Sequence, residues 1–278
     1  MFKILPINLV LRSFKKQEYT FEYNLTRRCN LNCKNCSRFA KFYDKSSDVS
    51  FEEFKRDFDC ILEFSDFKNI KHTILSGGEA TIVKDFFEII EYIRSNFDGT
   101  ISVCTNGAKI LTFSESELER LKRSKVIFIV TKYPFSTINY EKVFQILDQS
   151  GIEHQNFKDF DESENDRVVF SNRFIISKKL KTFFRKIGQC CAFLPYFYKG
   201  KVYACSDAIP GKREFNGASL KEFKSFKEVI RFVLNDHEKD YFCERCLREI
   251  RISAWEVDKS NSIDFYLLSK KDEEYYTE

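Results

Sequence analysis

Three cysteines near the start of the chain have the spacing of a metal-binding loop. Cys29, Cys33 and Cys36 stand in the order C-x-x-x-C-x-x-C. Thiolates are soft ligands that suit iron-sulfur clusters or zinc, and an iron-sulfur cluster is normally held by four of them. Three thiolates on one compact loop would leave one iron without a protein ligand, and a catalytic metal site keeps such an open position. The alternatives are three buried cysteines, or a zinc site that a distant side chain such as His72 completes.

A second set of cysteines lies beyond residue 188. It comprises Cys190, Cys191, Cys205, Cys243 and Cys246, of which the last two form a C-x-x-C pair. Four of these thiolates can close a cluster completely, and the spacing leaves open which of the two adjacent cysteines takes part. The alternative is a zinc site with four cysteines, for which C-x-x-C pairs are also typical. Cys60 and Cys104 fall inside a predicted helix and a predicted strand, and we interpret them as small core residues.

Polar motifs end three of the predicted strands. They are Gly77, Gly78 and Glu79 after the second strand, Thr105 and Asn106 after the third, and Thr131 and Lys132 after the fourth. Two glycines let backbone groups approach a ligand closely, and Glu79 could accept hydrogen bonds from an ammonium group. For the third and fourth strand ends, a turn or a helix cap is an equally good explanation.

Strands and helices alternate along the first part of the chain. Residues 19–25 alternate strictly between two faces and predict a strand that ends before Cys29. Ser50 and Glu53 form a capping box in front of a helical apolar repeat. The pattern then recurs, with strands predicted at 71–75, 100–105 and 126–131 and helices at 83–94, 115–122 and 140–147. Such crossovers predict an α/β fold with a parallel sheet, in which ligands bind at the carboxyl ends of the strands.

The pattern changes in the second half of the chain. One or two late strands are expected within residues 168–176, and a hairpin is expected at 196–198 and 202–205 around Lys199 and Gly200. Ser225 and Glu228 are placed to cap a further helix. We therefore predict a main domain at 1–187, a small cysteine-rich domain at 188–260 and a polar tail at 261–278.

Composition narrows the partners and the compartment. Of 278 residues, 43% are apolar and 32% are charged, as in soluble globular proteins. The 46 basic and 42 acidic residues give a net charge of +4, which is too balanced to indicate a nucleic-acid or membrane partner. Neither a cleavage site nor a membrane-spanning stretch follows the apolar run at 4–11, and ten cysteines without an export signal favour a reducing compartment. We expect a cytoplasmic protein.

The cysteine spacing after a first strand, together with Gly-Gly-Glu at the end of the second, resembles the radical S-adenosylmethionine (SAM) superfamily. The resemblance implies a partial (β/α)6 parallel barrel in which Cys29, Cys33 and Cys36 hold a catalytic 4Fe-4S cluster. It also implies that the polar strand ends bind SAM. The residues concerned are Gly77, Gly78 and Glu79 at its methionine part, and Thr105, Asn106, Thr131 and Lys132 at its ribose and carboxylate. The family usually has an aromatic residue before the third cysteine, against adenine, whereas this chain has Asn35.

The later cysteines resemble the Twitch extension of this superfamily, a shortened relative of the SPASM domain. The resemblance implies one auxiliary 4Fe-4S cluster in a small C-terminal domain. Since a fully ligated cluster has no open position, it suggests an electron acceptor. The leading hypothesis is therefore cleavage of SAM to a deoxyadenosyl radical and net oxidation of a small hydroxylated or amino-sugar-like substrate, with a reducing partner such as flavodoxin or ferredoxin.

Two other functions stay open at this point. Similar proteins epimerise or crosslink ribosomally made peptides, and a protein of a different class could be a non-catalytic iron-sulfur electron carrier or sensor. The Gly-Gly-Glu segment argues against a carrier, which needs no cofactor pocket.

The sequence identifies no catalytic base, for which Lys132, Tyr133 and Asp207 are only candidates. The positive charge of Arg27, Arg28 and Lys132 would suit a phosphate group or would balance an anionic cluster.

Overall fold

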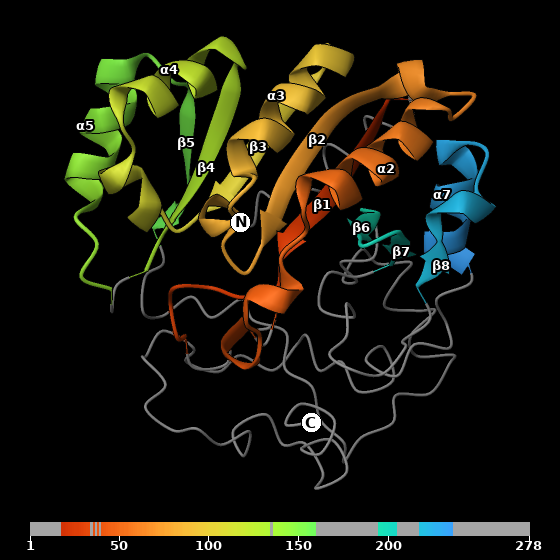
Figure 1. The fold of residues 1–278 in the computed structure, drawn as a ribbon, viewed down its shortest axis with the longest axis horizontal. Helices are drawn as coiled ribbons and strands as arrows, with labels where there is room; N and C mark the ends of the chain where they lie inside the picture. Colours follow the sequence, from red (N-terminus) through yellow and green to blue (C-terminus); the bar gives the residue numbers. More distant parts are fainter. Residues whose placement is uncertain are drawn as a thin grey trace, which may run out of the picture.

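The computed structural model describes residues 18–33, 36, 38, 40–133, 136–159, 194–204 and 217–235. Within these ranges the strands form one sheet in the order β5-β4-β3-β2-β1-β6-β7-β8 (Figure 1). The strands are β1 (Tyr19–Thr26), β2 (Ile70–Gly77), β3 (Thr100–Thr105), β4 (Val126–Lys132), β5 (His154–Asp159), β6 (Tyr196–Tyr198), β7 (Lys201–Tyr203) and β8 (Ala218–Ser219). The α-helices are α2 (Phe51–Leu62), α3 (Phe86–Asn96), α4 (Glu115–Arg123), α5 (Tyr140–Ser150) and α7 (Phe226–Asn235). No helix of this part of the chain is long and apolar enough to cross a membrane.

The strands from β5 to β6 in this order run parallel. β1 to β5 pair as consecutive neighbours, and each crossover between them contains one of the helices α2 to α5. β6 pairs in parallel with the other edge of β1, where Glu22 lies opposite Tyr196. The predicted α/β fold with a parallel sheet is confirmed. The sequence pattern does not predict β5, because His154, Gln155 and Asn156 lack an apolar alternation, and the strands expected at 168–176 lie outside the described residues.

The predicted hairpin is confirmed and joins the same sheet. β6 and β7 pair antiparallel, and the turn residues Lys199 and Gly200 have φ angles of 44° and 74°. Two positive φ angles are typical of a type I′ turn, whose twist matches that of the flanking strands. Because β6 also pairs with β1, this part of the predicted C-terminal domain is continuous with the main sheet. The proposed boundary at residue 188 stays a prediction.

The capping signals lie where the sequence places them. Ser50 and Glu53 form a complete capping box at the start of α2. At α7, the Glu228 N–H donates to Ser225 Oγ at 3.3 Å, whereas the Glu228 carboxylate accepts from the Lys224 N–H at 2.8 Å. The Glu228 carboxylate thus binds the N–H of Lys224, one residue before the Ser225 N–H that a complete capping box would use.

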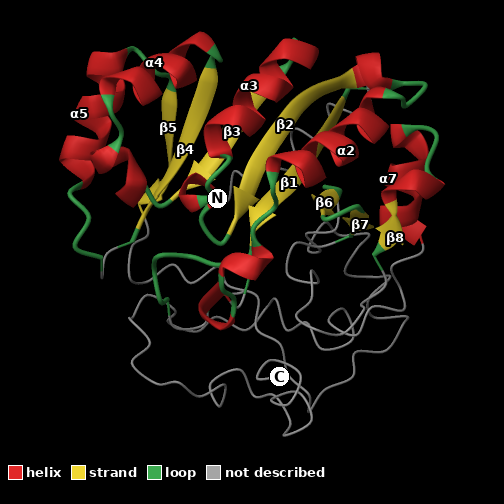
Figure 2. Ribbon diagram, in the orientation of Figure 1, coloured by secondary structure: helices red, strands yellow, loops and turns green. Residues whose placement is uncertain are grey.

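The two sides of β1 differ in character. Phe21 and Tyr23 are buried on the side that α2 covers, and Tyr23 packs edge-to-face on Phe54 with 4.8 Å between ring centres. Figure 2 shows α2 and α3 in front of the strands. Full burial of one such side chain contributes about 1.5–3 kcal/mol. The alternate residues Glu22 and Asn24 point to the opposite side, and they are buried as well. We call this opposite side of β1, β2 and β3 the polar face; it includes Glu22, Asn24, His72, Ser76 and Ser102.

His72 lies on the polar face, far from the cysteines. It is opposite Thr20 near the start of β1, and the strand from Thr20 to Thr26 spans roughly 20 Å. Its Nε2 atom is 2.8 Å from Ser102 Oγ on β3. The interpretation in which His72 completes a zinc site with the cysteines is therefore wrong. Burial lowers the pKa of His72 to about 4.

His72 should make stability depend on pH in the mildly acid range. Its pKa is near 6.5 in the unfolded chain and about 4 in the folded chain, so the unfolded state binds more protons between these values. The free energy of unfolding should therefore fall as the pH is lowered from 6.5 to 4, by roughly 3 kcal/mol from this side chain. His72→Gln should flatten that dependence in urea unfolding at a series of pH values. If the free energy of unfolding depended on pH as steeply in His72→Gln as in the wild type, this result would contradict a buried, neutral His72 imidazole.

Candidate functional site

The cysteine loop, residues 27–48, leaves the end of β1 and leads towards α2 (Figure 1). Cys29, Cys33 and Cys36 are not part of a disulfide, and Cys33 is buried. The Cys36 N–H donates to the Cys33 carbonyl oxygen at 3.3 Å, and the Leu31 N–H donates to Cys29 Sγ at 3.3 Å. The three predicted metal-binding residues thus share one loop at the carboxyl end of a central strand.

The thiols fit an iron-sulfur cluster by their chemistry, although they do not yet surround one point. Burial raises the pKa of the Cys29 thiol, and the Glu79 carboxylate and the Cys36 and Cys33 thiols raise it further. A coordinated cation acts in the opposite direction and favours the thiolate. Among the described residues, no three Cys, His, Asp or Glu side chains converge as a metal site. Metal-binding loops commonly close only around their ion, so the three ligands stay a prediction.

Glu79 is buried at the end of β2 and accepts four hydrogen bonds. Its Oε1 accepts from the Thr81 N–H at 3.2 Å, the Thr81 hydroxyl at 2.6 Å and the Thr105 hydroxyl at 2.7 Å. Its Oε2 accepts from the Asn106 N–H at 2.7 Å. Burial raises the pKa of Glu79, while these hydrogen bonds lower it. The carboxylate thereby joins the end of β2 to the end of β3.

The two glycines before Glu79 let two segments of the chain approach closely. A Cβ atom on Gly77 would lie 2.2 Å from the Thr26 carbonyl oxygen, and one on Gly78 would lie 2.2 Å from the Arg28 carbonyl oxygen. The Gly78 N–H donates to that Thr26 oxygen at 2.9 Å, and the Glu79 N–H donates to the Arg28 oxygen at 3.0 Å. The glycines are therefore required where the β2 turn packs on the cysteine loop, which accounts for them without a ligand.

Asn106 connects this carboxylate to the cysteine loop. Its backbone N–H binds Glu79, and its side-chain Nδ2 donates to Asn30 Oδ1 at 2.7 Å and to Cys29 Sγ at 3.7 Å. Its own Oδ1 accepts from the Ala108 N–H at 3.0 Å, which fixes the orientation of the amide. The structure thus brings together predicted residues from the ends of β1, β2 and β3.

Comparison with known proteins agrees with this arrangement. Residues 23–136, which include the cysteine loop, Glu79 and Asn106, match the family model described as "Radical SAM superfamily". The comparison supports the radical SAM superfamily for this chain. The matched segment is called the radical SAM region below.

Curated relatives match part of the chain. A "Probable GTP 3',8-cyclase" of Pyrococcus abyssi is 32% identical over 52% of this chain and 46% of its own length. An "Fe-coproporphyrin III synthase" of Methanosarcina barkeri is 34% identical over 39% of this chain and 26% of its own length. The chain spans less than half the length of these relatives.

One solved structure shares the fold over most of both chains. The crystal structure of BtrN in complex with AdoMet and 2-DOIA has a TM-score of 0.56 and 12% identity. The match covers 88% of this chain and 98% of BtrN. At this identity the likeness shows the fold alone, and nothing of the substrate.

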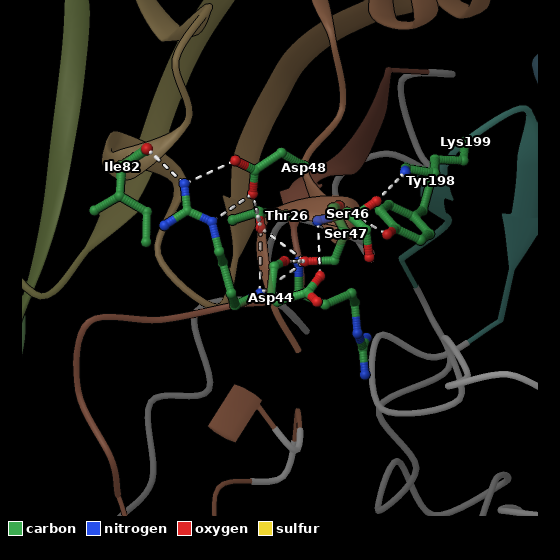
Figure 3. A network of polar contacts seen from close by, with 10 residues as sticks. Thr26, Asp44, Ser46, Ser47, Asp48, Ile82, Tyr198 and Lys199 are labelled. Carbon is green, nitrogen blue, oxygen red and sulfur yellow. Dashed lines mark hydrogen bonds and ion pairs between the residues drawn. The ribbon is translucent and has the colours of Figure 1, made fainter. Parts of the chain in front are cut away.

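Arg28 and Asp48 close the base of the cysteine loop. Arg28 donates from Nε and Nη2 to the two oxygens of Asp48 at 2.8 and 2.7 Å, and from Nη2 to the Ile82 carbonyl oxygen at 2.9 Å. The hydroxyl of Thr26, the last residue of β1, donates to Asp48 at 2.6 Å. Figure 3 shows Thr26, Asp48 and Ile82 gathered around this point. The charge of Arg28 is therefore used within the radical SAM region.

The β6–β7 hairpin supports the same loop from the other side. The Tyr198 hydroxyl donates to the Ser47 carbonyl oxygen at 2.8 Å, and Lys199 Nζ donates to the Ser46 carbonyl oxygen at 2.8 Å (Figure 3). The Gly200 N–H donates to Asp57 on α2 at 2.7 Å. The cysteine loop is thus held between the β2 turn and the hairpin.

The end of β4 contacts α5. Lys132 Nζ lies 5.3 Å from the centre of the Phe144 ring, and the Tyr133 N–H donates to the Tyr140 hydroxyl oxygen at 2.9 Å. Burial raises the pKa of Tyr140, and the nearby Cys33 thiol and Glu79 carboxylate add to this effect. The sequence pattern places Tyr140 only on the apolar stripe of a helix, and so misses a hydroxyl beside the cysteine loop. Cofactor contacts of Thr131 and Lys132 stay predictions.

Several predicted site residues lie outside the described ranges. They are the second cysteine set, Cys190, Cys191, Cys205, Cys243 and Cys246, together with Asn35 and the candidate base Asp207. The auxiliary site therefore stays a prediction.

Glu79→Gln should loosen the junction between β2, β3 and the cysteine loop. The amide keeps one acceptor oxygen but turns a donor towards N–H or hydroxyl groups that also donate. We expect the free energy of unfolding to fall by about 1–3 kcal/mol in urea unfolding, and SAM to bind more weakly in equilibrium dialysis. Glu153→Gln, at an exposed glutamate, is the control. Equal behaviour of the two variants would contradict the role given to Glu79.

Asp48→Asn should weaken the base of the cysteine loop. It removes the charge that Arg28 binds and one of the acceptors. The free energy of unfolding should fall by about 1–3 kcal/mol, and less iron should stay bound after anaerobic reconstitution and desalting. The control Glu88→Gln neutralises a more exposed partner of Arg120 and should change stability by less than about 1 kcal/mol. If both variants retain iron equally, Asp48 does not hold the loop.

Proposed function

We propose that the chain is a radical SAM enzyme with a catalytic 4Fe-4S cluster on Cys29, Cys33 and Cys36. The observation that carries the proposal is the hydrogen-bonded connection from Glu79 through Asn106 to Cys29, since it joins the predicted SAM-binding strand ends to a predicted cluster ligand. These cysteines would hold the cluster, which when bound would supply the electron for cleavage of SAM to a deoxyadenosyl radical and so for hydrogen abstraction from the substrate.

The chain's own residues would position this chemistry. Arg28 and Asp48 fix where the cysteine loop leaves and re-enters the fold. Asn106 orients Cys29 by donating to its sulfur, and hydrogen bonds to a ligand sulfur tune the potential of an iron-sulfur site. The four hydrogen bonds to Glu79 hold that carboxylate in place without solvent.

We further propose a net oxidation of a small hydroxylated or amino-sugar-like substrate. A second 4Fe-4S cluster on Cys205, Cys243, Cys246 and one of Cys190 and Cys191 would accept an electron, and a flavodoxin or ferredoxin in the cytoplasm would reduce the first. The contact between the β6–β7 hairpin and the cysteine loop supports this, because Cys205 follows the last residue of β7 by two positions in the sequence. BtrN, which shares the fold, was crystallised with AdoMet and 2-DOIA.

The curated relatives favour a second candidate, an enzyme that acts on an anionic nucleotide such as GTP. A triphosphate needs several cationic side chains in its site. Two arginines of the cysteine loop already bind carboxylates: Arg28 pairs with Asp48, and Arg38 pairs with Glu22 at 2.8 Å. The described part of the site therefore suits an uncharged substrate better than a polyanion.

Iron content and SAM cleavage test the proposal. Anaerobic reconstitution should give about eight iron atoms per chain if both clusters form. An iron content of about four per chain that is the same in Cys243→Ala would show that the auxiliary cluster does not form. Dithionite and SAM should release deoxyadenosine from the wild-type chain and not from Cys33→Ala, while Cys60→Ala, at a cysteine on α2, should retain the activity. A fully loaded chain that releases none would instead be an electron carrier.

A further inference from the structure

The polar face of β1 and β2 is unusual for a parallel sheet. Strands of such sheets are normally apolar on both sides. Here Glu22, Asn24 and Ser76 are each more than nine-tenths buried, on the side opposite α2. Burying polar groups lowers stability unless they are paired. A face that departs from what packing alone would select is the kind of place where function is expected.

Arg38 joins this face to the cysteine loop. It donates from Nη2 to Glu22 Oε1 at 2.8 Å and from Nη1 to Asn24 Oδ1 at 2.6 Å. The Ser76 hydroxyl also donates to Glu22 Oε1. Arg38 follows Cys36 by two residues, and Ser76 directly precedes the Gly-Gly-Glu turn. The group therefore lies beside the proposed SAM site, and the charges of Glu22 and Arg38 offset each other.

Asn24 keeps a donor unused. A guanidinium has only donors, so the contact with Arg38 requires that the oxygen of Asn24 faces it. The amino group must then point elsewhere, and among the described residues the buried Nδ2 atom has no hydrogen-bond partner. Such a group is expected to gain an acceptor when a ligand binds.

We propose that Glu22, Asn24, Arg38 and Ser76 bind an uncharged, hydroxyl-bearing part of the substrate, whose oxygen accepts from Asn24 Nδ2. The balanced Glu22–Arg38 pair disfavours a charged group at this point, and the amide donor requires an oxygen acceptor. The inference rests on the proposed function and narrows its substrate to a polyhydroxylated molecule that is neutral where it meets β1.

Binding of three probes to the reconstituted, SAM-loaded chain without reductant tests this. The probes are myo-inositol as a neutral polyol, glucosamine as a cation and GTP as a polyanion, each titrated calorimetrically under anaerobic conditions. The wild-type chain should bind myo-inositol in preference to the other two, and Asn24→Leu should weaken that binding about tenfold, as expected for one hydrogen bond to a buried donor. Preference for GTP or glucosamine, or equal binding of myo-inositol by wild type and Asn24→Leu, would overturn the inference.

Two further variants separate recognition from folding. Thr73→Val is the matched control, because Thr73 Oγ1 is also buried and has no partner in the part of the chain that the structure describes, but lies opposite Phe21 on the helix-covered side. This variant should leave myo-inositol binding unchanged. Asn24→Asp keeps the shape and adds a charge beside Glu22, so the preference should move from myo-inositol towards glucosamine. If the folded Asn24→Asp variant still preferred myo-inositol to glucosamine as strongly as the wild type does, this result would also contradict the proposed site.

The inference and the proposed function can fail separately. Deoxyadenosine released by dithionite without any probe depends on the cluster and SAM, and not on Asn24 recognition. Release without Asn24-dependent binding would leave the radical SAM enzyme standing and remove this site. Asn24-dependent binding of myo-inositol without release of deoxyadenosine would support this site and contradict the radical SAM enzyme.

Discussion

The buried carboxylate of Glu79 is the interaction on which the geometry of the site depends. A carboxylate is stable away from solvent only when donors surround it, and here the donors come from its own turn and from the end of β3. Two neighbouring parallel strands are therefore fixed to each other at their carboxyl ends. Asn106, placed by one of these hydrogen bonds, reaches Cys29 on the loop after β1. The orientation of a predicted cluster ligand thus follows from a contact on another strand.

Around this junction, the cysteine loop is fixed at its base. Arg28 and Asp48 bring its two ends together, and Tyr198 and Lys199 support Ser47 and Ser46 from the hairpin. These contacts lie near residue 28 and at 46–48, whereas the thiols lie between them. A metal-binding loop needs such an anchor, because the anchor keeps the ligands in register with the pocket when the ion binds.

Periodicity and capping predict most of the fold and little of this junction. Alternation in β1 and the capping box of α2 are local signals, and the structure confirms the elements that they predict. β5 lacks such a signal because its residues are polar, and it forms through its pairing with β4. The Gly-Gly-Glu motif marks the right place, but the sequence interprets its glycines by a ligand, whereas the structure explains them by the close approach of the Thr26 and Arg28 carbonyls.

Arg38 shows why long-range contacts escape such reasoning and why they matter. Nothing in the spacing of residues 36–40 predicts that Arg38 reaches Glu22 and Asn24, since the contact depends on the path of the cysteine loop over the sheet. That path is set at the base of the loop by Arg28 and Asp48. The same loop therefore carries the cluster ligands and the side chain that orients Asn24. Formation of the substrate site and formation of the cluster site are consequently linked, because a displaced loop would remove Arg38 from the polar face and leave Glu22 as a buried, unpaired charge.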